Sequence, residues 1–415
     1  MEKKKGLSLQ TILTIAGIAL IYVLAFLLDR IPGVPIMLTT VLRKGAIYSL
    51  VAVSMNLLNG FMGLFSLGQA GFMLVGAYAF AAINISSGIR STVYQYYDPL
   101  LKFSLTETLQ NALGNTAGTV LGVFVSLLLA GLLAAGLAYL IGLPVLKLKS
   151  DYLAIATLGF AEIIRAAVVY EGFGPLTNGS NLLYGFTSFA SFNLSLGGTT
   201  LHLETVMPFL FSGICIAIIL LLINSTYGRA FKAIRDDEIA AEAMGINLAK
   251  HKMLSFCISS FFAGVGGALF AMFVNNAQAK VYTSTMTYEI LLIVVIGGIG
   301  SISGSCLATF LYVACAEWWL RFLDSPMTFT SVTDTRRILF ILVFAALVIG
   351  GALLLIRRER RTTKKVWKEL LVSLAALALL VWLAFFIISG SLTVPLLRTG
   401  FRMVVFSVII MIVVL

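Results

Sequence analysis

The sequence predicts an all-α, polytopic integral membrane protein with about 10 to 12 transmembrane helices. Of its 415 residues, 60% are hydrophobic and only 11% are charged, too few charges to cover the surface of a soluble globule. The mean hydropathy is +1.01. Apolar residues continue for about 17 to 25 positions at a time, which is the length that a helix needs to cross a bilayer. These segments do not alternate polar with apolar residues, so a transmembrane β-barrel is excluded.

The hydropathy places candidate spans along the whole chain. They cover residues of about 10–28, 41–58, 68–83, 117–141, 152–169, 206–224, 253–274, 287–300, 304–322, 337–356, 370–388 and 399–415. The opening MEKKK and the apolar run behind it lack a small-residue cleavage site. We therefore expect an uncleaved first helix rather than a signal peptide.

Basic residues predict the orientation, because Lys and Arg accumulate in cytoplasmic loops. With the N-terminus inside, segments 143–150, 225–252 and 357–368 are internal, and together with Lys3, Lys4 and Lys5 they hold 17 of the 29 basic residues. The outer side then receives loops 85–115 and 171–205, and the second of these contains no Lys or Arg. Both termini are expected in the cytoplasm. The net charge of +11 is explained by this asymmetry, and no nucleic-acid partner is implied.

A first glycine-rich stretch interrupts the apolar pattern and supplies candidate residues for a translocation pathway. Backbone that is not helical at membrane depth survives only where it faces protein or a watery cavity. The helix that follows such a break offers unpaired N–H groups to an anionic carboxylate. The alternative is that small residues let helices pack closely or mark a tight turn. The candidate residues are Gly60, Gly63, Ser66, Gly68 and Gln69.

A second stretch, GGIGSISGS at 297–305, lies between two short apolar runs. Its candidate pathway residues are Gly297, Gly298 and Gly300. Two such breaks are typical of paired discontinuous helices in transporters.

The polar inner loop predicts a short docking helix for another protein. Asp236 is expected to cap it, and Gly245 to end it. Small and flexible apolar residues share one face by their i, i+3 and i+4 spacing, so a partner could approach closely there. The alternative is an ordinary solvated loop helix. The candidate docking residues are Asp237, Glu238, Ala240, Ala241, Ala243, Met244 and Gly245.

Glu162 and Arg165 are three residues apart within a predicted span and can form an ion pair on one helix face. Charged groups inside a membrane are costly, so the pair either lines the pathway and binds charged groups of the substrate or acts as an interior strut between helices. Glu289 and Glu317 also lie at or within spans, without an evident partner.

The sequence argues against an enzyme. The four cysteines lie in apolar runs, and neither they nor the two histidines have the spacing of metal ligands, so no metal or bound cofactor is expected. The chain has no Gly-Lys dipeptide and hence no P-loop. Any ATP must be used by a partner subunit.

Four stretches together resemble the LivM-type permeases of branched-chain amino acid ABC importers. They are Met55–Phe80, Leu148–Arg165, Gly228–Ala271 and Glu289–Gly304. The resemblance implies a permease with a second related permease, two cytoplasmic ATPase subunits and an extracytoplasmic binding protein as partners. It also implies that the inner loop is the segment that couples to the ATPases. The family pattern there is Glu-Ala-Ala, three residues, then Gly. Ala240, Ala241 and Gly245 fit this pattern, whereas Ile239 replaces the glutamate.

The resemblance divides the chain into permease helices (1–323), an inserted pair of helices with a basic loop (324–393) and a last permease helix (394–415). The chain stops in an apolar run rather than a basic tail, which favours a truncated C-terminus. Three alternatives remain open: the same fold carrying urea, short amides or other amino acids, a stand-alone channel or ion-coupled carrier, and a scaffold whose basic loop binds anionic lipid.

Overall fold

The computed structural model describes residues 22, 25–28, 35–148, 150–196 and 199–319. Nearly all of them belong to one compact unit, Met1–Trp318. Outside the described residues lie most of the predicted span 10–28, the predicted spans 337–356, 370–388 and 399–415, and the segments 324–393 and 394–415.

Helices dominate the described part of the chain. The α-helices are α2 (Ile36–Asn56), α3 (Gln69–Asn84), α4 (Arg90–Val93), α5 (Leu105–Leu113), α6 (Asn115–Val145), α7 (Ser150–Val169), α8 (Gly174–Thr177), α9 (Val206–Asn224), α10 (Thr226–Asp236), α11 (Glu238–Ala243), α12 (Leu248–Val274), α13 (Ser284–Gly297) and α14 (Ile302–Ala314). Two π-helices, η1 (Leu57–Met62) and η4 (Cys315–Trp319), and two 3-10 turns, η2 (Glu171–Phe173) and η3 (Phe189–Ser191), accompany them.

Among the described residues, four short strands form two antiparallel pairs. They are β1 (Leu183–Tyr184), β2 (Asn193–Leu196), β3 (Thr199–His202) and β4 (Asn276–Ala277). β1 pairs with β4, which is distant in the sequence, and β2 pairs with β3 as a hairpin. β1, β2 and β3 lie in the predicted outer loop 171–205, and β4 follows the predicted span 253–274. The prediction of an all-α fold is confirmed for the helical body.

Five of the described helices are long and apolar enough to cross a membrane: Ile36–Met62, Asn115–Val145, Tyr152–Val169, Val206–Ile223 and Leu248–Val274. Each of them overlaps a predicted span. Three further apolar helices are shorter, and α3 with 16 residues is about 24 Å long, less than the hydrocarbon core of a bilayer. Short apolar helices next to glycine breaks are what the sequence predicted for discontinuous spans.

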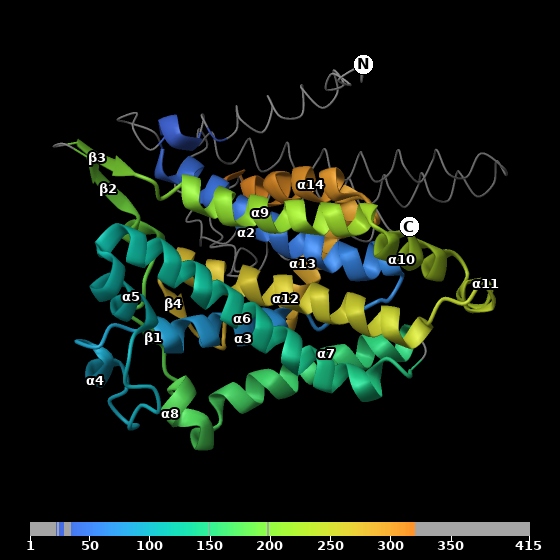
Figure 1. Cartoon of the computed structure of the whole chain (residues 1–415), viewed down its shortest axis with the longest axis horizontal. Coiled ribbons are helices and arrows are strands. Elements are labelled where there is room, and N and C mark those ends of the chain that lie inside the picture. Colours follow the sequence, from blue (N-terminus) through green and yellow to red (C-terminus); the bar gives the residue numbers. More distant parts are fainter. Residues whose placement is uncertain (1–21, 23–24, 29–34, 149, 197–198, 320–415) are drawn as a thin grey trace, which may run out of the picture. The chain divides into compact units, whose positions relative to one another are not determined.

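The long helices run side by side, and the molecule has two ends that differ in structure (Figure 1). The strands lie at one end together with α4, α5 and α8, and we call this the strand end. α10 and α11 lie at the other, which we call the elbow end.

Helix α12 is the centre of this unit. In its most apolar window 72% of the residues are buried, compared with 28–39% in α6, α7 and α9. Glycines let neighbouring helices approach it closely: a Cβ on Gly264 would lie 2.5 Å from the Cβ of Ala134. Small residues at helix contacts are typical of membrane proteins, where close packing rather than the hydrophobic effect holds helices together.

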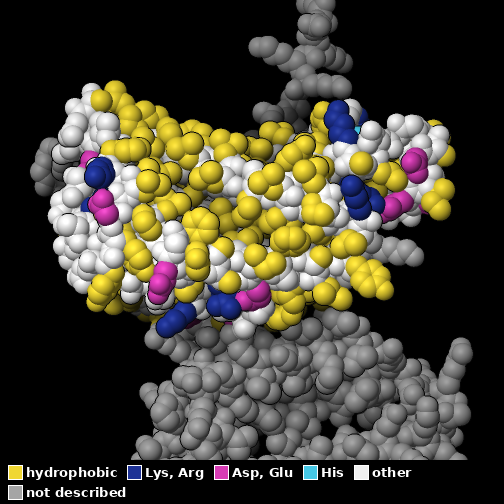
Figure 2. Space-filling model, turned by 90° about the horizontal axis from the view of Figure 1, so that it is seen from below, with side chains coloured by type: hydrophobic (Ala, Val, Ile, Leu, Met, Phe, Trp, Pro, Cys, Tyr) yellow, Lys and Arg dark blue, Asp and Glu magenta, His cyan; other side chains and the backbone are white. Residues whose placement is uncertain are grey.

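Helices α6 and α9 leave large apolar side chains on the surface. Leu140 is 64% exposed and Leu221 is 73% exposed. Figure 2 shows one face of the molecule, on which hydrophobic side chains cover most of the middle while charged side chains gather toward the two ends and along the lower edge. Such an apolar band between charged ends is what a bilayer requires.

The strand end is held together by buried polar groups. Arg90, which is 4% exposed, donates to the backbone carbonyls of Leu101, Ile85 and Phe103. The side-chain oxygen of Asn84 accepts a hydrogen bond from Thr106 in α5, with a length of 2.6 Å. Predicted loop 85–115 is thus an ordered cap on the ends of the membrane helices.

Candidate functional site

The inner loop folds as two helices, α10 and α11, joined at a sharp bend that we call the elbow. Asp237 has extended backbone there, with φ −158° and ψ 112°, and its carboxylate accepts from the N–H groups of Ile239 and Ala240 at 2.9 and 3.0 Å. The prediction that Asp236 caps this helix is therefore wrong by one residue. Asp236 is still the last residue of α10, and its carboxylate accepts hydrogen bonds from the side chain of Arg235 instead.

Gly245 ends α11, as the sequence predicted. Its φ is +84°, and the following Ile246 N–H donates to the carbonyl of Ala241 at 3.1 Å. The N–H of Gly245 donates to Glu242 at 2.9 Å. These two bonds form a Schellman motif, which needs a left-handed residue at this position and so favours glycine.

The docking face predicted on α11 is exposed. Met244 is 84% exposed, and Ala240 and Ala243 are also exposed. Ile239, where the family pattern has glutamate, adds a side chain that is 82% exposed. Ala241 is 4% exposed and faces inward, so it does not contribute to this exposed face.

An ion pair fixes the direction of α11. Lys252 Nζ in the first turns of α12 lies 2.7 Å from Glu238 Oε2. The predicted span from 253 begins earlier in the structure, at Leu248, because the side chain of Asn247 accepts from the Lys250 N–H at 3.0 Å and caps α12. The elbow is thereby joined directly to the central helix.

The first glycine break follows α2 and η1. The helix ends at Met62, Gly63 has φ +79°, and residues 63–68 are not helical before α3 begins at Gln69. The predicted break and the helix behind it are confirmed.

The amides near the start of α3 are not open as predicted. The N–H of Ala70 donates to Thr287 Oγ1 in α13 at 3.2 Å, and the N–H of Leu67 donates to Thr157 Oγ1 in α7 at 3.0 Å. Gln69 is 3% exposed, and its Nε2 donates to Ser54 Oγ at 2.6 Å. Side chains from two other helices, α7 and α13, therefore bind backbone amides that the sequence analysis reserved for an anionic ligand. Ser66 is also buried, at 3% exposure.

The second glycine break lies between α13 and α14. Gly298 and Gly300 have positive φ values, and Ser301 caps α14 by accepting from the Gly304 N–H at 3.1 Å. A Cβ on Gly297 would lie 2.6 Å from the backbone of Gly304. The glycines here allow both a tight turn and close contact of the two helices. This agrees with the alternative that small residues serve helix packing and turns.

Asn56, at the end of α2, joins the two breaks. It is 0% exposed, and its Oδ1 accepts from the Gly300 N–H at 2.8 Å. Its Nδ2 donates to the Ser301 carbonyl at 3.0 Å and to Ser305 Oγ at 2.8 Å. A Cβ on Gly60 would lie 2.5 Å from the Gly300 nitrogen, so the two breaks are in direct contact. Sequence reasoning missed Asn56, although an asparagine in an apolar span just before a glycine break was a signal.

Glu162 and Arg165 form the predicted ion pair on α7. Glu162 Oε2 accepts from Arg165 Nε at 2.7 Å and lies 2.6 Å from Nη2. The two side chains are 39% and 38% exposed. The pair joins residues of one helix and is partly exposed within an apolar span, which does not fit an interior strut between helices.

Two further ion pairs lie toward the strand end. Glu317, which the sequence left without an evident partner, forms one with Lys44 of α2. Arg43 Nη1 lies 2.8 Å from Glu204 Oε2. Both pairs hold α2 to segments far along the chain.

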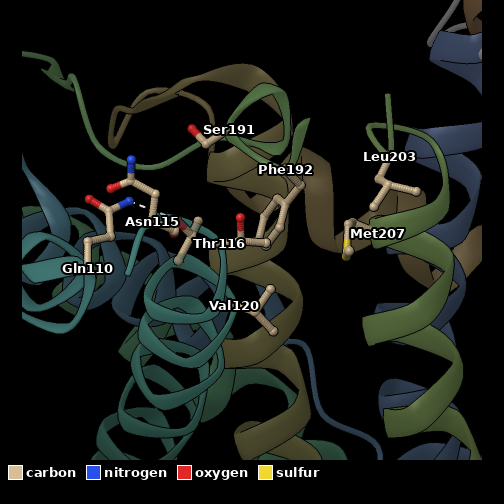
Figure 3. Close-up of a pocket in the computed structure, with 9 residues that line it drawn as sticks. Gln110, Asn115, Thr116, Val120, Ser191, Phe192, Leu203 and Met207 are labelled. Carbon is tan, nitrogen blue, oxygen red and sulfur yellow. Dashed lines mark hydrogen bonds between the residues drawn. The ribbon is translucent and has the colours of Figure 1, made fainter. Parts of the chain in front are cut away.

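A cavity of about 150 Å³ lies at the strand end, between α5, α6 and α9 (Figure 3). Gln110, Asn115 and Thr116 contribute polar groups, and Phe192 and Met207 contribute apolar ones. Sites for small molecules usually measure about 300 to 1,000 Å³, so we do not assign this cavity to a substrate. Neither glycine break contributes residues to the lining of this cavity.

Comparison with known proteins gives a consistent result. The family model described as "Branched-chain amino acid transport system / permease component" matches residues 37–349. The high-affinity branched-chain amino acid transport system permease proteins LivM of Escherichia coli and Salmonella typhimurium are each 30% identical to the chain, over 303 and 302 residues. In both cases the match covers 68% of this chain and 63% of the relative, so the chain spans less than two thirds of these relatives.

A third relative is the probable branched-chain amino acid transport permease protein LivM of Methanocaldococcus jannaschii. It is 25% identical over 288 residues, which cover 67% of this chain and 79% of the relative. No solved structure matches the chain. Together with its apolar helices, the family match makes the chain a multi-pass protein of the inner membrane. The chain belongs to the family of branched-chain amino acid transport permease components.

Proposed function

We propose that this chain is the membrane-spanning permease subunit of an ATP-driven importer for branched-chain, hydrophobic amino acids. The observation that carries the proposal is the exposed apolar face of α11, formed by Ile239, Ala240, Ala243 and Met244. It lies at the elbow end, which we propose faces the cytoplasm because Lys and Arg accumulate in cytoplasmic loops.

An apolar helix face outside the membrane is stabilised when a partner protein covers it. Burying a side chain such as Ile239 or Met244 in a groove contributes about 1.5 to 3 kcal/mol each. The alanines between them leave room for the walls of that groove. We propose that the partners here are two cytoplasmic ATPase subunits, since the sequence lacks a P-loop. A second related permease and an extracytoplasmic binding protein complete the proposed assembly.

The translocation pathway is proposed on the flank of α7 that carries Glu162 and Arg165. A charged pair that is nearly 40% exposed is costly against lipid and favourable beside water or protein. Amino acids are zwitterions, so a carboxylate and a guanidinium side by side match their two charged groups. Ile163, 60% exposed on the same helix, offers apolar surface for the side chain of a substrate. We propose that the second permease covers this flank.

The glycine breaks are proposed as the parts of the pathway wall that move. Non-helical backbone changes its φ and ψ angles at lower cost than a helix interior, and such sites act as hinges in transporters. The non-helical residues concerned are Gly63, Ser66, Gly68, Gly298 and Gly300, while the other candidates, Gly60, Gln69 and Gly297, lie in the helices that flank the breaks.

Reconstitution tests the proposal. The chain is purified with the proposed partners and placed in liposomes that contain ATP, and the uptake of radiolabelled leucine and urea is compared. We expect leucine uptake that stops without ATP or without the binding protein. Leucine flux through the chain alone would instead favour the carrier or channel, and uptake of urea in place of leucine would assign another cargo to the same fold.

A further inference from the structure

Arg235 connects the elbow to the glycine breaks. Its Nη1 donates to the carbonyl oxygen of Gly60 at 3.1 Å, while Nε and Nη2 donate to Asp236 Oδ1 at 3.1 and 2.9 Å. We infer that Arg235 is a positioning residue that transmits movement of α11 to both glycine breaks. The inference rests on the proposed function, because it needs an ATPase partner that moves the elbow.

The Gly60 carbonyl accepts from Arg235 because the helix ends there. In the last turn of a helix the carbonyls have no N–H partner farther along the chain, and they carry the negative end of the helix dipole. A cation at this place is therefore favoured. Lys232, one turn earlier in α10, places a second cation near the end of this helix, with its Nζ 5.7 Å from the centre of the Phe61 ring.

Gly63 leaves room for the aliphatic stem of the Arg235 side chain, and Gly300 lies beside its guanidinium. A Cβ on Gly63 would lie 2.8 Å from Arg235 Cγ, and one on Gly300 would lie 3.4 Å from Arg235 Nη1. Both glycines also have positive φ, which side chains with a Cβ rarely adopt. One side chain from the elbow thus lies against both breaks, which Asn56 already joins to each other.

The two helices of the elbow are attached to different parts of the molecule, so α11 can move relative to α10. α11 is held to α12 by the Glu238–Lys252 pair, while α10 is held to the breaks by Arg235. A partner that pulls on Ile239 and Met244 therefore acts on the joint between these attachments. The Arg235 side chain is 39% exposed, and its contact with the break is a single hydrogen bond that can break and form again.

The test uses the complete reconstituted complex and compares Arg235→Met with Arg229→Met. Arg229 is an exposed arginine on the same helix and serves as the matched control. In Arg235→Met we expect ATP hydrolysis to stay within about twofold of the native complex, and leucine taken up per ATP hydrolysed to fall about tenfold, a typical coupling effect. Arg229→Met should keep the native ratio. Arg235→Lys keeps the charge with a single point donor and should give an intermediate ratio.

A second measurement remains decisive if Arg235→Met does not assemble. Hydrogen exchange of the amides in segments 57–68 and 297–301 is followed in the native complex and in Arg235→Lys, with and without ATP. We expect ATP to change their protection in the native complex and to change it less in Arg235→Lys. An unchanged uptake per ATP in Arg235→Met, or equal ATP-dependent exchange in both proteins, would overturn the inference. A native complex that takes up no leucine with ATP would instead contradict the proposed function.

Discussion

The two ends of the molecule use arginine in different ways. At the strand end, Arg90 is buried and donates to three backbone carbonyls, so its guanidinium is enclosed. At the elbow end, Arg235 is partly exposed and donates to one carbonyl and to the neighbouring Asp236. Separating Arg90 from its carbonyls therefore costs more free energy than separating Arg235 from Gly60. Arg90 makes more hydrogen bonds to the backbone, and water has less access to its guanidinium.

The same contrast holds for the surrounding backbone. The strand end closes its loops with buried side chains such as Asn84 and with β pairing between Leu183 and Ala277. The elbow end instead presents an exposed apolar helix, whereas glycines with positive φ occur at both ends. We therefore expect substitutions at the strand end to change stability, and those at the elbow end to change coupling.

The largest effect on stability is expected from Arg90→Met. The change leaves three carbonyls without their donor, and each hydrogen bond to a charged group typically contributes about 1.5 to 3 kcal/mol. The purified protein should unfold at a clearly lower temperature, as followed by circular dichroism in detergent. Arg235→Met is the comparison, with an expected cost below about 1 kcal/mol because its pair is exposed. Equal shifts in the two variants would break the contrast between the ends.

The next effect is expected from Asn56→Leu, which leaves the Gly300 N–H without its acceptor. An unsatisfied buried group costs about 1 to 3 kcal/mol, so stability falls, and uptake falls with it because the two breaks separate. Asn224→Leu, an exposed asparagine at the end of α9, is the control. If Asn56→Leu kept native melting and uptake, Asn56 would not join the breaks.

A smaller effect on stability is expected from Gly245→Leu. No atom lies within 4 Å of a Cβ there, so the cost is the strain of positive φ, about 1 to 2 kcal/mol. This strain distorts the end of α11, and we expect ATP hydrolysis to continue while leucine uptake is lost, with membrane insertion intact. Gly136→Leu on α6 also meets no atom within 4 Å and has no positive φ, so it should transport normally. Native leucine uptake by Gly245→Leu would count against the docking role of the elbow.

The smallest effect is a pH dependence at the strand end. Burial raises the pKa of Glu107, but hydrogen bonds from the Ser86 hydroxyl (2.5 Å) and the Ser87 N–H (3.0 Å) outweigh it, and the net pKa is lowered. A lowered pKa contributes stability that is present above the unfolded value and lost as pH falls through the folded value. The melting temperature of the native protein should exceed that of Glu107→Gln at pH 7, and the difference should shrink below about pH 4. If the difference in melting temperature did not change with pH, the charge of the Glu107 carboxylate would not contribute to stability.

Much of the fold was predictable from the sequence because it depends on local composition. The predicted spans overlap the long helices, and the glycine breaks and the helix that Gly245 ends lie where the sequence placed them. The ion pair of Glu162 and Arg165 was also predictable, since it needs only the i, i+3 geometry of one helix.

The contacts that define the candidate site were not predictable in this way. The partners of Asn56 are about 244 residues away, those of Ala70 about 217 and those of Arg235 about 175. A hydrogen bond between such residues depends on how whole helices pack, and the sequence pattern of either segment does not contain that information. The error over Asp236 is local instead, because its carboxylate accepts from the neighbouring Arg235 and Asp237 caps α11.

Composition and periodicity determined that this chain spans a membrane many times, where its helices are interrupted and which short helix offers an apolar face. Bilayer thickness and backbone chemistry act on each segment separately, which is why sequence alone suffices for these points. Only the tertiary structure decided that the two breaks touch, that threonines of α7 and α13 satisfy the amides near the start of α3, and that Arg235 joins the elbow to the breaks. Those features arise from close packing of segments that meet after the helices have formed.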